Sequence, residues 1–445
     1  MSNILIIGAG RSSSSLIKYL SDNSEKENWK ITVADASLES AHQKTKGMKN
    51  VCAIQLDVNN KNLRQVEIGN ADIIISMLPP DLHYIVAEDC VELKKNMVTA
   101  SYISDKIKAL DNGAKDAGII LLNEMGLDPG IDHLSAMKII NEIKENGGTI
   151  LSFKSYTGGL VSPEYNNNPW GYKFTWNPRN VILAGQGTAK CIENNEYRYI
   201  PYNRIFKQIE LMDIEDYGQF EGYANRDSLS YRQPYGIENV PTILRGTLRN
   251  PGYCKAWNAL ALLGLTDDTY IIEDSEHLSY AQLIKAFLPP IIKGDSIESA
   301  FARFIGEEID SEVMNKIKWL GLFTDETIEL PKATPAFILQ KLLEKKWLLK
   351  PGEKDMIIMQ HLFDYELSGK KMKLTSTLVV KGDDEVYTAM AKTVGLPLGI
   401  AAKLILQHKI NEKGVQMPLF KDIYQPVLME LETYGIIFKE LRVEI

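Results

Sequence analysis

The fold is decided by residues 3–15, "NILIIGAGRSSSS", in which a short apolar run ends in a glycine turn and four serines follow. The turn contains Gly8, Gly10, Arg11, Ser12 and Ser13, and it matches the dinucleotide fingerprint Gly-x-Gly-x-x-Gly except for Ser13 at the third glycine. The first glycine makes the tight turn and the second lets a pyrophosphate approach the backbone, whereas the third only eases packing of the helix on the strand. Serine hydroxyls and free N–H groups at the start of a helix suit a phosphate. The stretch therefore predicts a nucleotide site, the alternative being a glycine-rich turn that binds nothing.

Short runs of Ile, Val and Leu recur along the first 125 residues, and helix-like stretches separate several of them. After residues 3–7 the runs are WKITVAD, CAIQLDV, ADIIISMLP, NMVTASY and GIILLNEMG. Continuous apolar strands separated by helices are typical of a parallel sheet that is covered on both faces. The sequence therefore predicts an α/β protein whose first domain is a doubly wound Rossmann sheet.

Polar side chains stand where the predicted strands end, which is the edge where open α/β sheets bind ligands. Asp35 ends the second strand, where a carboxylate accepts hydrogen bonds from the ribose hydroxyls and repels a 2′-phosphate. Asp35 therefore predicts NAD(H) rather than NADP(H), unless it only starts the next turn. The other strand ends are Asp57-Val58, Ser76-Met77-Leu78-Pro79 and Ser101-Tyr102, each of which could equally be turn chemistry.

The bulk composition is that of a soluble globular protein with two or three domains. The chain has 445 residues, of which 44% are hydrophobic and 24% charged. A net charge of −8 and the lack of a Lys/Arg cluster argue against a nucleic-acid partner. The cysteines fit no zinc or CxxC spacing, which predicts buried free thiols in a reducing compartment. We see no apolar run near the ~18 residues of a membrane span and no signal sequence. We therefore expect a cytoplasmic protein with no membrane partner.

The pattern of alternating apolar runs and helix-like stretches ends at about residue 146. Strand-like segments follow, then a long loop at 161–180 rich in Asn, Pro and aromatic residues, and a mostly helical region at 255–350. An apolar helix near 388–407 is expected to return to the first domain. The predicted organisation is a Rossmann domain at 1–127 completed by about 388–445, a substrate-binding α/β domain at 128–254 and 351–387, and a helical domain at 255–350.

The stretch "EMGLDPGIDHL", residues 124–134, concentrates Asp128, Asp132 and His133 around an Asp-Pro-Gly turn. A metal site is disfavoured, because no second His/Cys cluster joins these side chains and hydride transfer to nicotinamide needs no metal; we expect none. An Asp-Pro pair before an apolar run predicts a helix start with Asp128 at the N-cap and Pro129 at N1. This capping role does not exclude substrate binding or proton transfer by Asp128.

Two arginines are candidate carboxylate ligands. Arg226 lies in "YANRDSLSYRQ", and Arg245 precedes Gly246 and Thr247 in "TILRGTLRNPG". A forked guanidinium beside a glycine and a hydroxyl makes a good carboxylate clamp. Two of them would suit a substrate with several carboxylates, the alternative being ordinary surface ion pairs.

Several spaced motifs then point to one family. They are SYIS, NEMGLDPGIDHL, SFKSYTGGL, NPWGYKFTW, NRDS, LRGTLR, TSTLV and AMAKTVGLPLGIAAKLIL, in order along essentially the whole chain. Together they resemble the saccharopine dehydrogenases that form L-glutamate, also called saccharopine reductases. The resemblance implies a Rossmann domain, a second α/β domain and a helical domain. It also implies an oxidoreductase of lysine metabolism that interconverts saccharopine, NAD(P)+ and water with L-glutamate and 2-aminoadipate 6-semialdehyde, by hydride transfer between a secondary amine and an imine.

The resemblance also implies the site residues. Substrate contacts fall on Ser101, Tyr102, Asp128, Arg226, Arg245, Gly246 and Thr247. Cofactor contacts fall on Gly8, Gly10, Arg11, Ser12, Ser13, Asp35, Asp57, Val58, Ser76, Met77, Leu78, Pro79, Ser101, Leu127 and Asp128, and segment 172–179 should approach the cofactor. Saccharopine carries three carboxylates, which suit the arginines, and an amine that suits Asp128. Tyr102 and Asp128 are the candidate catalytic residues for proton handling.

The chain departs from the family pattern in three places. The fungal pattern has a Cys at Thr157, and we expect that thiol to be dispensable. The fungal turn after strand two carries an arginine suited to NADPH, whereas Asp35 predicts NAD(H), with NADP(H) allowed by the family. Arg11 and the serines replace a more apolar pattern, and we expect Arg11 to lie near the pyrophosphate. Two alternatives stay open: a related imine reductase such as a carboxynorspermidine dehydrogenase, and a non-catalytic NAD-binding sensor. We expect a homodimer.

Overall fold

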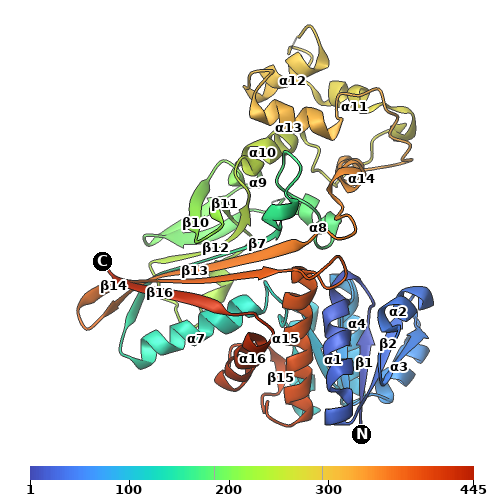
Figure 1. Ribbon diagram of the computed structural model, residues 1–445, viewed down its shortest axis with the longest axis vertical. Helices are drawn as coiled ribbons and strands as arrows, with labels where there is room; N and C mark the ends of the chain where they lie inside the picture. The colour runs from blue at the N-terminus through green and yellow to red at the C-terminus, as the bar shows by residue number, and fades with distance from the viewer. Residues whose placement is uncertain (185, 293) are drawn as a thin grey trace. The chain divides into compact units, whose positions relative to one another are not determined.

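The computed structural model describes residues 1–184, 186–292 and 294–445, and these residues form two compact units (Figure 1). The first unit comprises Met1–Thr149, Leu367–Gly369 and Leu378–Lys439. The second comprises Ile150–Glu366, Lys370–Thr377 and Glu440–Ile445.

The first unit is built on a parallel sheet with the strand order β15-β6-β5-β4-β1-β2-β3. The strands are β1 (Ser2–Ile7), β2 (Trp29–Asp35), β3 (Val51–Gln55), β4 (Ile73–Ser76), β5 (Asn96–Thr99), β6 (Ile120–Leu122) and β15 (Gly414–Gln416). Three successive isoleucines of β4, residues 73–75, are each 0% exposed. Because successive side chains point to opposite faces, this burial requires cover on both sides of the sheet. The predicted Rossmann sheet is confirmed, with the order β3-β2-β1-β4-β5-β6 of a dinucleotide-binding fold.

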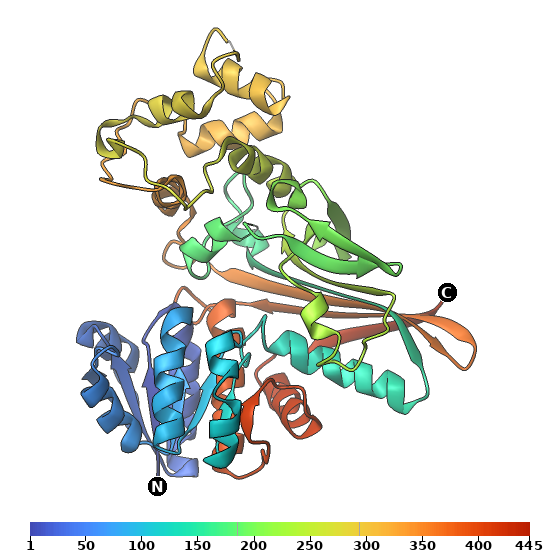
Figure 2. The same ribbon diagram turned by 180° about the vertical axis from the view of Figure 1, so that it is seen from behind.

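Helices cover both faces of this sheet. In Figure 1, α1 and α15 lie on the near face, and Figure 2 shows α4 on the other. The helices of this unit are α1 (Ser14–Glu27), α2 (Leu38–Thr45), α3 (Lys61–Gly69), α4 (His83–Glu92), α5 (Asp105–Lys108), α6 (Asp111–Asp116), α7 (Ile131–Glu145), α15 (Ala389–Leu406) and α16 (Lys421–Thr433), with short 3-10 turns at Arg11–Ser13 and Pro80–Leu82. The predicted return of the 388–407 helix is confirmed, since a Cβ at Gly395 of α15 would lie 2.7 Å from the Leu16 nitrogen of α1.

Helix α15 corrects one expectation from the sequence. By length and composition it could cross a membrane, with a mean hydropathy of 1.5 over 18 residues, contrary to our statement that no run approaches this length. However, 78% of that window is buried inside the protein, as in a core helix. Pro397 lies inside the helix without ending it.

The second unit is built on a mixed sheet with the order β10-β11-β12-β7-β13-β14-β16, to which β8 and β9 are attached through β12. The strands are β7 (Thr149–Val161), β8 (Ala189–Glu193), β9 (Glu196–Ile200), β10 (Ile209–Ile214), β11 (Gly218–Ala224), β12 (Thr242–Arg249), β13 (Asp355–Leu367), β14 (Lys370–Lys381) and β16 (Phe438–Glu444). The helices are α8 (Pro178–Leu183), α9 (Tyr202–Ile205), α10 (Tyr253–Leu263), α11 (Tyr280–Phe287), α12 (Ile297–Ile305), α13 (Glu312–Leu320) and α14 (Pro335–Trp347), with 3-10 turns at Pro163–Tyr165, Leu229–Tyr231 and Ser275–His277.

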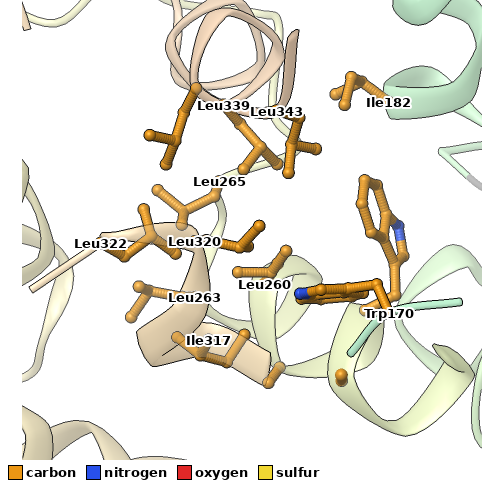
Figure 3. Close-up of a cluster of buried hydrophobic side chains, with 14 of the residues drawn as sticks. Trp170, Ile182, Leu260, Leu263, Leu265, Ile317, Leu320, Leu322, Leu339 and Leu343 are labelled. Atoms are coloured by element: carbon orange, nitrogen blue, oxygen red, sulfur yellow. The ribbon is translucent and has the colours of Figure 1, made fainter. Parts of the chain in front are cut away.

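The described residues of the helical region at 255–350 are grouped with this second unit. Leucines of α10, α13 and α14 gather with Trp170 and Ile182, which come from the preceding loop and α8 (Figure 3). The Trp170 indole is fully buried and donates to the carbonyl of Lys316 at 2.9 Å. The helices and the 161–184 segment therefore share one hydrophobic core.

Two further boundaries differ from the predicted ones. Residues 128–149, mostly α7, lie in the first unit, where Asn141 of α7 donates to the hydroxyl of Tyr424 on α16 at 3.1 Å. Residues 440–445 lie in the second unit, because β16 joins its sheet beside β14. The prediction of buried thiols is correct for Cys90, Cys191 and Cys254, whereas Cys52 is exposed on the edge strand β3.

Candidate active site

The glycine turn lies at the carboxyl end of β1, between the ends of β2 and β4. The N–H of Gly8 donates to Ala34 at 2.8 Å, and the N–H of Met77 donates to Ile7 at 2.8 Å. Gly8 has φ 111°, and a Cβ built on it would lie 2.7 Å from the Met77 carbonyl oxygen, so both conformation and space require glycine. Gly10 is exposed, and no atom lies within 4 Å of a Cβ built there, so packing does not require it. The backbone at Gly10 is thus open to a ligand, as the fingerprint predicts.

Asp35 is tied to this turn. Its carboxylate accepts from the N–H of Ala9 at 2.7 Å and from the N–H of Ser37 at 2.9 Å. The structure shows that Asp35 starts the next turn and that it also borders the glycine turn, whereas its role in binding the ribose stays a prediction. A half-buried carboxylate held in this way is in place to accept ribose hydroxyls.

A lysine of α2 that the sequence analysis did not connect with the site lies beside the first turn of α1. Lys44, in the last turn of α2, donates to the Ser14 hydroxyl at 2.5 Å. Burial lowers the pKa of the Lys44 ammonium, and the neighbouring charge of Arg11 lowers it further. Ser13 is fully buried and donates to the Gly10 carbonyl at 2.8 Å, Ser12 is half-buried, and Arg11 is exposed. Arg11 and Lys44 therefore make this part of the predicted phosphate site basic.

The ends of β4 and β5 are joined by a buried histidine. His83 Nδ1 lies 2.8 Å from the Ser76 hydroxyl and 3.4 Å from the Thr99 hydroxyl. Burial lowers the pKa of His83 to about 4, so the ring is neutral at neutral pH. The Thr99 hydroxyl also accepts from the N–H of Ser101 at 3.3 Å. This network fixes Ser76 and Ser101 relative to each other, while Met77 and Leu78 are half-buried and Pro79 is exposed.

Asp57 and Val58 have local structural roles. Asp57 is exposed and accepts from the N–H of Asn59 at 2.9 Å, which is turn chemistry. The Val58 side chain is 6% exposed and packs in the core of the unit. Its carbonyl accepts from Arg64, whose guanidinium forms a buried ion pair with Asp89 at 2.5 Å. Adenine binding at this position stays a prediction.

The stretch 124–134 forms a tight turn followed by the start of α7. Helix α7 begins at Ile131 with Gly130 at its N-cap, so the prediction of Asp128 as N-cap and Pro129 as N1 is wrong. Pro129 instead follows a cis peptide bond, and its carbonyl accepts from the N–H of Gly126 at 2.9 Å in a tight turn before the helix. Asp132 accepts from the N–H of Gly130 at 2.6 Å. Asp128 is half-buried and does not cap the helix.

Tyr102 and Asp128 lie together in the first unit. The Tyr102 hydroxyl donates to an Asp128 carboxylate oxygen at 3.4 Å, which is long for a hydrogen bond. Leu127 beside them is 5% exposed. Both polar side chains are half-buried, which suits groups that meet a polar ligand.

Behind this pair lie buried ionisable groups that sequence reasoning did not connect. His133 is 0% exposed, its Nε2 lies 2.9 Å from Glu124 and its Nδ1 lies 3.9 Å from Asp132. No group of His, Cys, Asp and Glu among the described residues is arranged to hold a metal ion. The available signal was the helical position of His133, but nothing in the sequence identified Glu124 as its partner.

In the second unit, the two predicted arginines lie on segments that are bonded to each other. The Arg245 carbonyl on β12 accepts from the N–H of Asn225, and the N–H of Arg245 donates to the Ser228 hydroxyl, both at 2.8 Å. The Arg245 guanidinium lies 4.2 Å from the centre of the Tyr231 ring. Arg226 is exposed and has φ 54°. The structure thus brings the segments of Arg226 and Arg245 together.

Gly246 and Thr247 lie next to Arg245 on β12. A Cβ at Gly246 would lie 2.4 Å from the Tyr156 ring, so this glycine is required by close packing. Thr247 is half-buried and pairs across the sheet with Thr157 of β7 and Tyr223 of β11. In segment 172–179, Tyr172 and Phe174 are buried in the hydrophobic core, and the predicted approach of this segment to the cofactor stays a prediction.

The sheet order and glycine turn define a two-unit α/β protein with a Rossmann-type first unit. A family model described as the saccharopine dehydrogenase NADP binding domain matches residues 4–122, and one described as the saccharopine dehydrogenase C-terminal domain matches residues 126–436. The chain therefore belongs to the saccharopine dehydrogenase family, as its motifs predicted.

Relatives and a solved structure agree with this family. The saccharopine dehydrogenase (NADP(+), L-glutamate-forming) of Schizosaccharomyces pombe is 37% identical over 99% of this chain and 99% of its own length. The mitochondrial alpha-aminoadipic semialdehyde synthase of Rattus norvegicus is 37% identical over 98% of this chain, which spans 47% of that protein. The apo, histidine-tagged saccharopine dehydrogenase (L-Glu forming) from Saccharomyces cerevisiae matches with a TM-score of 0.89 and 33% identity over 100% of both chains.

Proposed function

We propose that this protein is an oxidoreductase of lysine metabolism that interconverts saccharopine and water with L-glutamate and 2-aminoadipate 6-semialdehyde, using a nicotinamide dinucleotide. The observation that carries the proposal is the end-to-end match. Both family domains are present, and a relative of the same length that is named as L-glutamate-forming is 37% identical over 99% of this chain.

The residues of the first unit fit a dinucleotide. Gly8 makes the turn, the exposed backbone at Gly10 leaves room for a pyrophosphate, and Arg11 and Lys44 supply positive charge beside it. When bound, the dinucleotide supplies the hydride acceptor or donor of the reaction. The chain positions the reactants and handles protons and charge.

Three polar side chains have roles that follow from their chemistry. Asp128 accepts a hydrogen bond from the cationic secondary amine of saccharopine. Tyr102, bonded to Asp128 at 3.4 Å, exchanges a proton with the amine nitrogen or with the water that adds to the imine. Arg245, whose guanidinium stacks on Tyr231, binds a substrate carboxylate and orients it.

We further propose that the enzyme prefers NAD(H) to NADP(H). Asp35 supports this preference, because its fixed carboxylate accepts ribose hydroxyls and repels a 2′-phosphate. The family domain and the S. pombe relative carry NADP in their names, and Arg11 and Lys44 would tolerate a phosphate. Asp35 is therefore the residue on which the preference depends.

Steady-state kinetics with the purified protein test both proposals. Saccharopine is supplied with NAD+ and with NADP+ in parallel reactions, and L-glutamate is identified by mass spectrometry. We expect glutamate in equimolar amount with the reduced dinucleotide, and a higher kcat/KM with NAD+. Reduction of imines derived from polyamines, with no glutamate from saccharopine, would contradict the substrate assignment. The variant Tyr102→Phe combined with Asp128→Ala should lose most turnover, and near-normal rates would refute their roles.

A further inference from the structure

We propose that Glu124, His133 and Asp132, here called the buried cluster, position Tyr102 and Asp128 for the reaction. None of the three is among the substrate or cofactor contacts that the family resemblance implies. The inference rests on the proposed function, because it concerns the two residues to which proton handling was assigned.

One end of the buried cluster holds the segment that carries Tyr102. The N–H of Glu124 donates to the Ser101 carbonyl at 3.0 Å, and a Glu124 carboxylate oxygen accepts from the N–H of Ile103 at 3.1 Å. Glu124 thus binds the backbone on both sides of Tyr102. Glu124 also has φ 56°, a conformation that Gly and Asn adopt more readily than Glu. Backbone conformation alone does not explain a glutamate here, whereas the contacts of its carboxylate do.

The other end holds the turn that carries Asp128. Asp132 accepts from the N–H of Gly130 at 2.6 Å through its carboxylate, and its own N–H donates to the Leu127 carbonyl at 3.0 Å. These contacts lie on both sides of Asp128. Asp132 therefore holds the backbone on both sides of Asp128, as Glu124 holds the backbone on both sides of Tyr102.

His133 follows Asp132 directly in the chain and contacts Glu124 through its side chain. Its Nε2 is 2.9 Å from the Glu124 oxygen that does not bind Ile103, and its Nδ1 is 3.9 Å from Asp132. The three side chains are 4%, 0% and 2% exposed for Glu124, His133 and Asp132 respectively. Burying ionisable groups is costly, and apolar replacements of similar volume are often as stable. Stability alone therefore does not explain the buried cluster, whereas positioning does.

Positioning matters here because displacement of a reacting group by ~1 Å reduces rates by about 100-fold. The Tyr102 and Asp128 side chains come from separate segments of the chain and are only 3.4 Å apart. The buried cluster ties together the backbones on which they stand. We infer that it sets the distance and orientation of this pair.

The test uses Glu124→Ala, Glu124→Gln and, as a control, Asp89→Asn. Gln keeps an oxygen for the N–H of Ile103, so we expect Glu124→Gln to retain more activity than Glu124→Ala. We expect Glu124→Ala to lower kcat/KM for saccharopine by about 10-fold to 100-fold, with dinucleotide affinity changed by less than about twofold. Asp89 is a buried carboxylate of the same unit that pairs with Arg64 on α3. Asp89→Asn should lower thermal stability without a comparable loss of kcat/KM.

A double-mutant cycle separates positioning from a general structural role. If Glu124 acts through Tyr102, then adding Glu124→Ala to Tyr102→Phe should lower kcat/KM by less than about threefold. Multiplicative losses, unchanged kcat/KM in Glu124→Ala, or wild-type rates in Tyr102→Phe would each overturn the proposal.

Hydrogen–deuterium exchange gives a measure that does not depend on turnover. We expect Glu124→Ala, which removes the acceptor of the Ile103 N–H, to raise exchange in peptides covering 100–104 and 125–131, and not in β1 or β2. An unchanged exchange pattern would overturn the proposal. If the wild-type protein does not oxidise saccharopine, the proposed function fails, while the exchange experiment still tests whether the buried cluster orders these two segments.

Discussion

His83 should make the first unit lose stability in mildly acidic solution. The ring is buried beside Ser76 and Thr99, and burial lowers its pKa from 6.5 to about 4. Between these values the unfolded chain binds a proton that the folded chain does not. Stability from this residue is therefore fully present above pH 6.5 and is lost as the pH falls toward 4.

The size of the effect follows from the two pKa values. A shift of 6.5 to about 4 corresponds to roughly 3 kcal/mol, since each unit is worth about 1.4 kcal/mol. About 2 kcal/mol of this amount should be lost by about pH 5 and about 3 kcal/mol by about pH 4. This is a large fraction of the stability of a typical domain, which is about 5–15 kcal/mol.

The assay is urea unfolding of the wild-type protein and of His83→Gln at pH 7 and pH 5, with exchange of the β4 amides reporting on the first unit. The variant removes the titrating ring and keeps polar atoms that can bond to Ser76. Its stability should respond less to pH, so the free-energy difference between wild type and variant should fall by about 2 kcal/mol from pH 7 to pH 5. A difference that is equal at both pH values would refute the assignment of a neutral buried His83.

Two substitutions test the binding residues. Replacing Asp35 by Ser should raise the ratio of kcat/KM for NADP+ to kcat/KM for NAD+ by at least about tenfold, because the substitution removes a negative charge that would repel the 2′-phosphate. An unchanged ratio in steady-state assays would contradict the role of Asp35. Replacing Gly246 by Ala should cost about 1–3 kcal/mol in urea unfolding and raise the KM for saccharopine, because the new Cβ would lie 2.4 Å from the Tyr156 ring. Wild-type stability and KM would show that this strand has room to move.

The Rossmann sheet was predictable because its strands are buried on both faces. Such burial leaves continuous apolar runs, as in Ile73–Ser76, and the chain alternates these runs with helices. The glycine turn was predictable for a similar reason, since the close contact of Gly8 with Met77 admits no side chain. Burial of a strand leaves a run of successive apolar residues, and the glycine requirement leaves a glycine directly after such a run. Both are therefore visible in the local sequence, although Gly8 and Met77 are far apart in the chain.

The features that sequence reasoning missed depend on contacts between distant residues. Lys44 reaches Ser14, which lies 30 residues earlier in the chain, and an amphipathic helix with a basic last turn does not reveal this contact. Trp170 lies in the loop before α8, yet it packs in the core of the helical region that follows much later in the chain. Asp128 was expected to cap α7, and the hydrogen bond between Gly126 and Pro129 moves the helix start to Ile131.

Thr157 stands where the fungal family pattern has a cysteine, and its hydroxyl is buried. Its hydroxyl is buried with no hydrogen-bond partner in the part of the chain that the structure describes, and it pairs across the sheet with Thr247. An unsatisfied buried hydroxyl costs about 1–3 kcal/mol, and Val would fill nearly the same space without that cost. The fungal pattern has a thiol at this position, and a buried free thiol behaves as a small apolar group. A hydroxyl without a partner thus lies opposite the predicted substrate residue Thr247, and the expectation that the fungal thiol is dispensable stays a prediction.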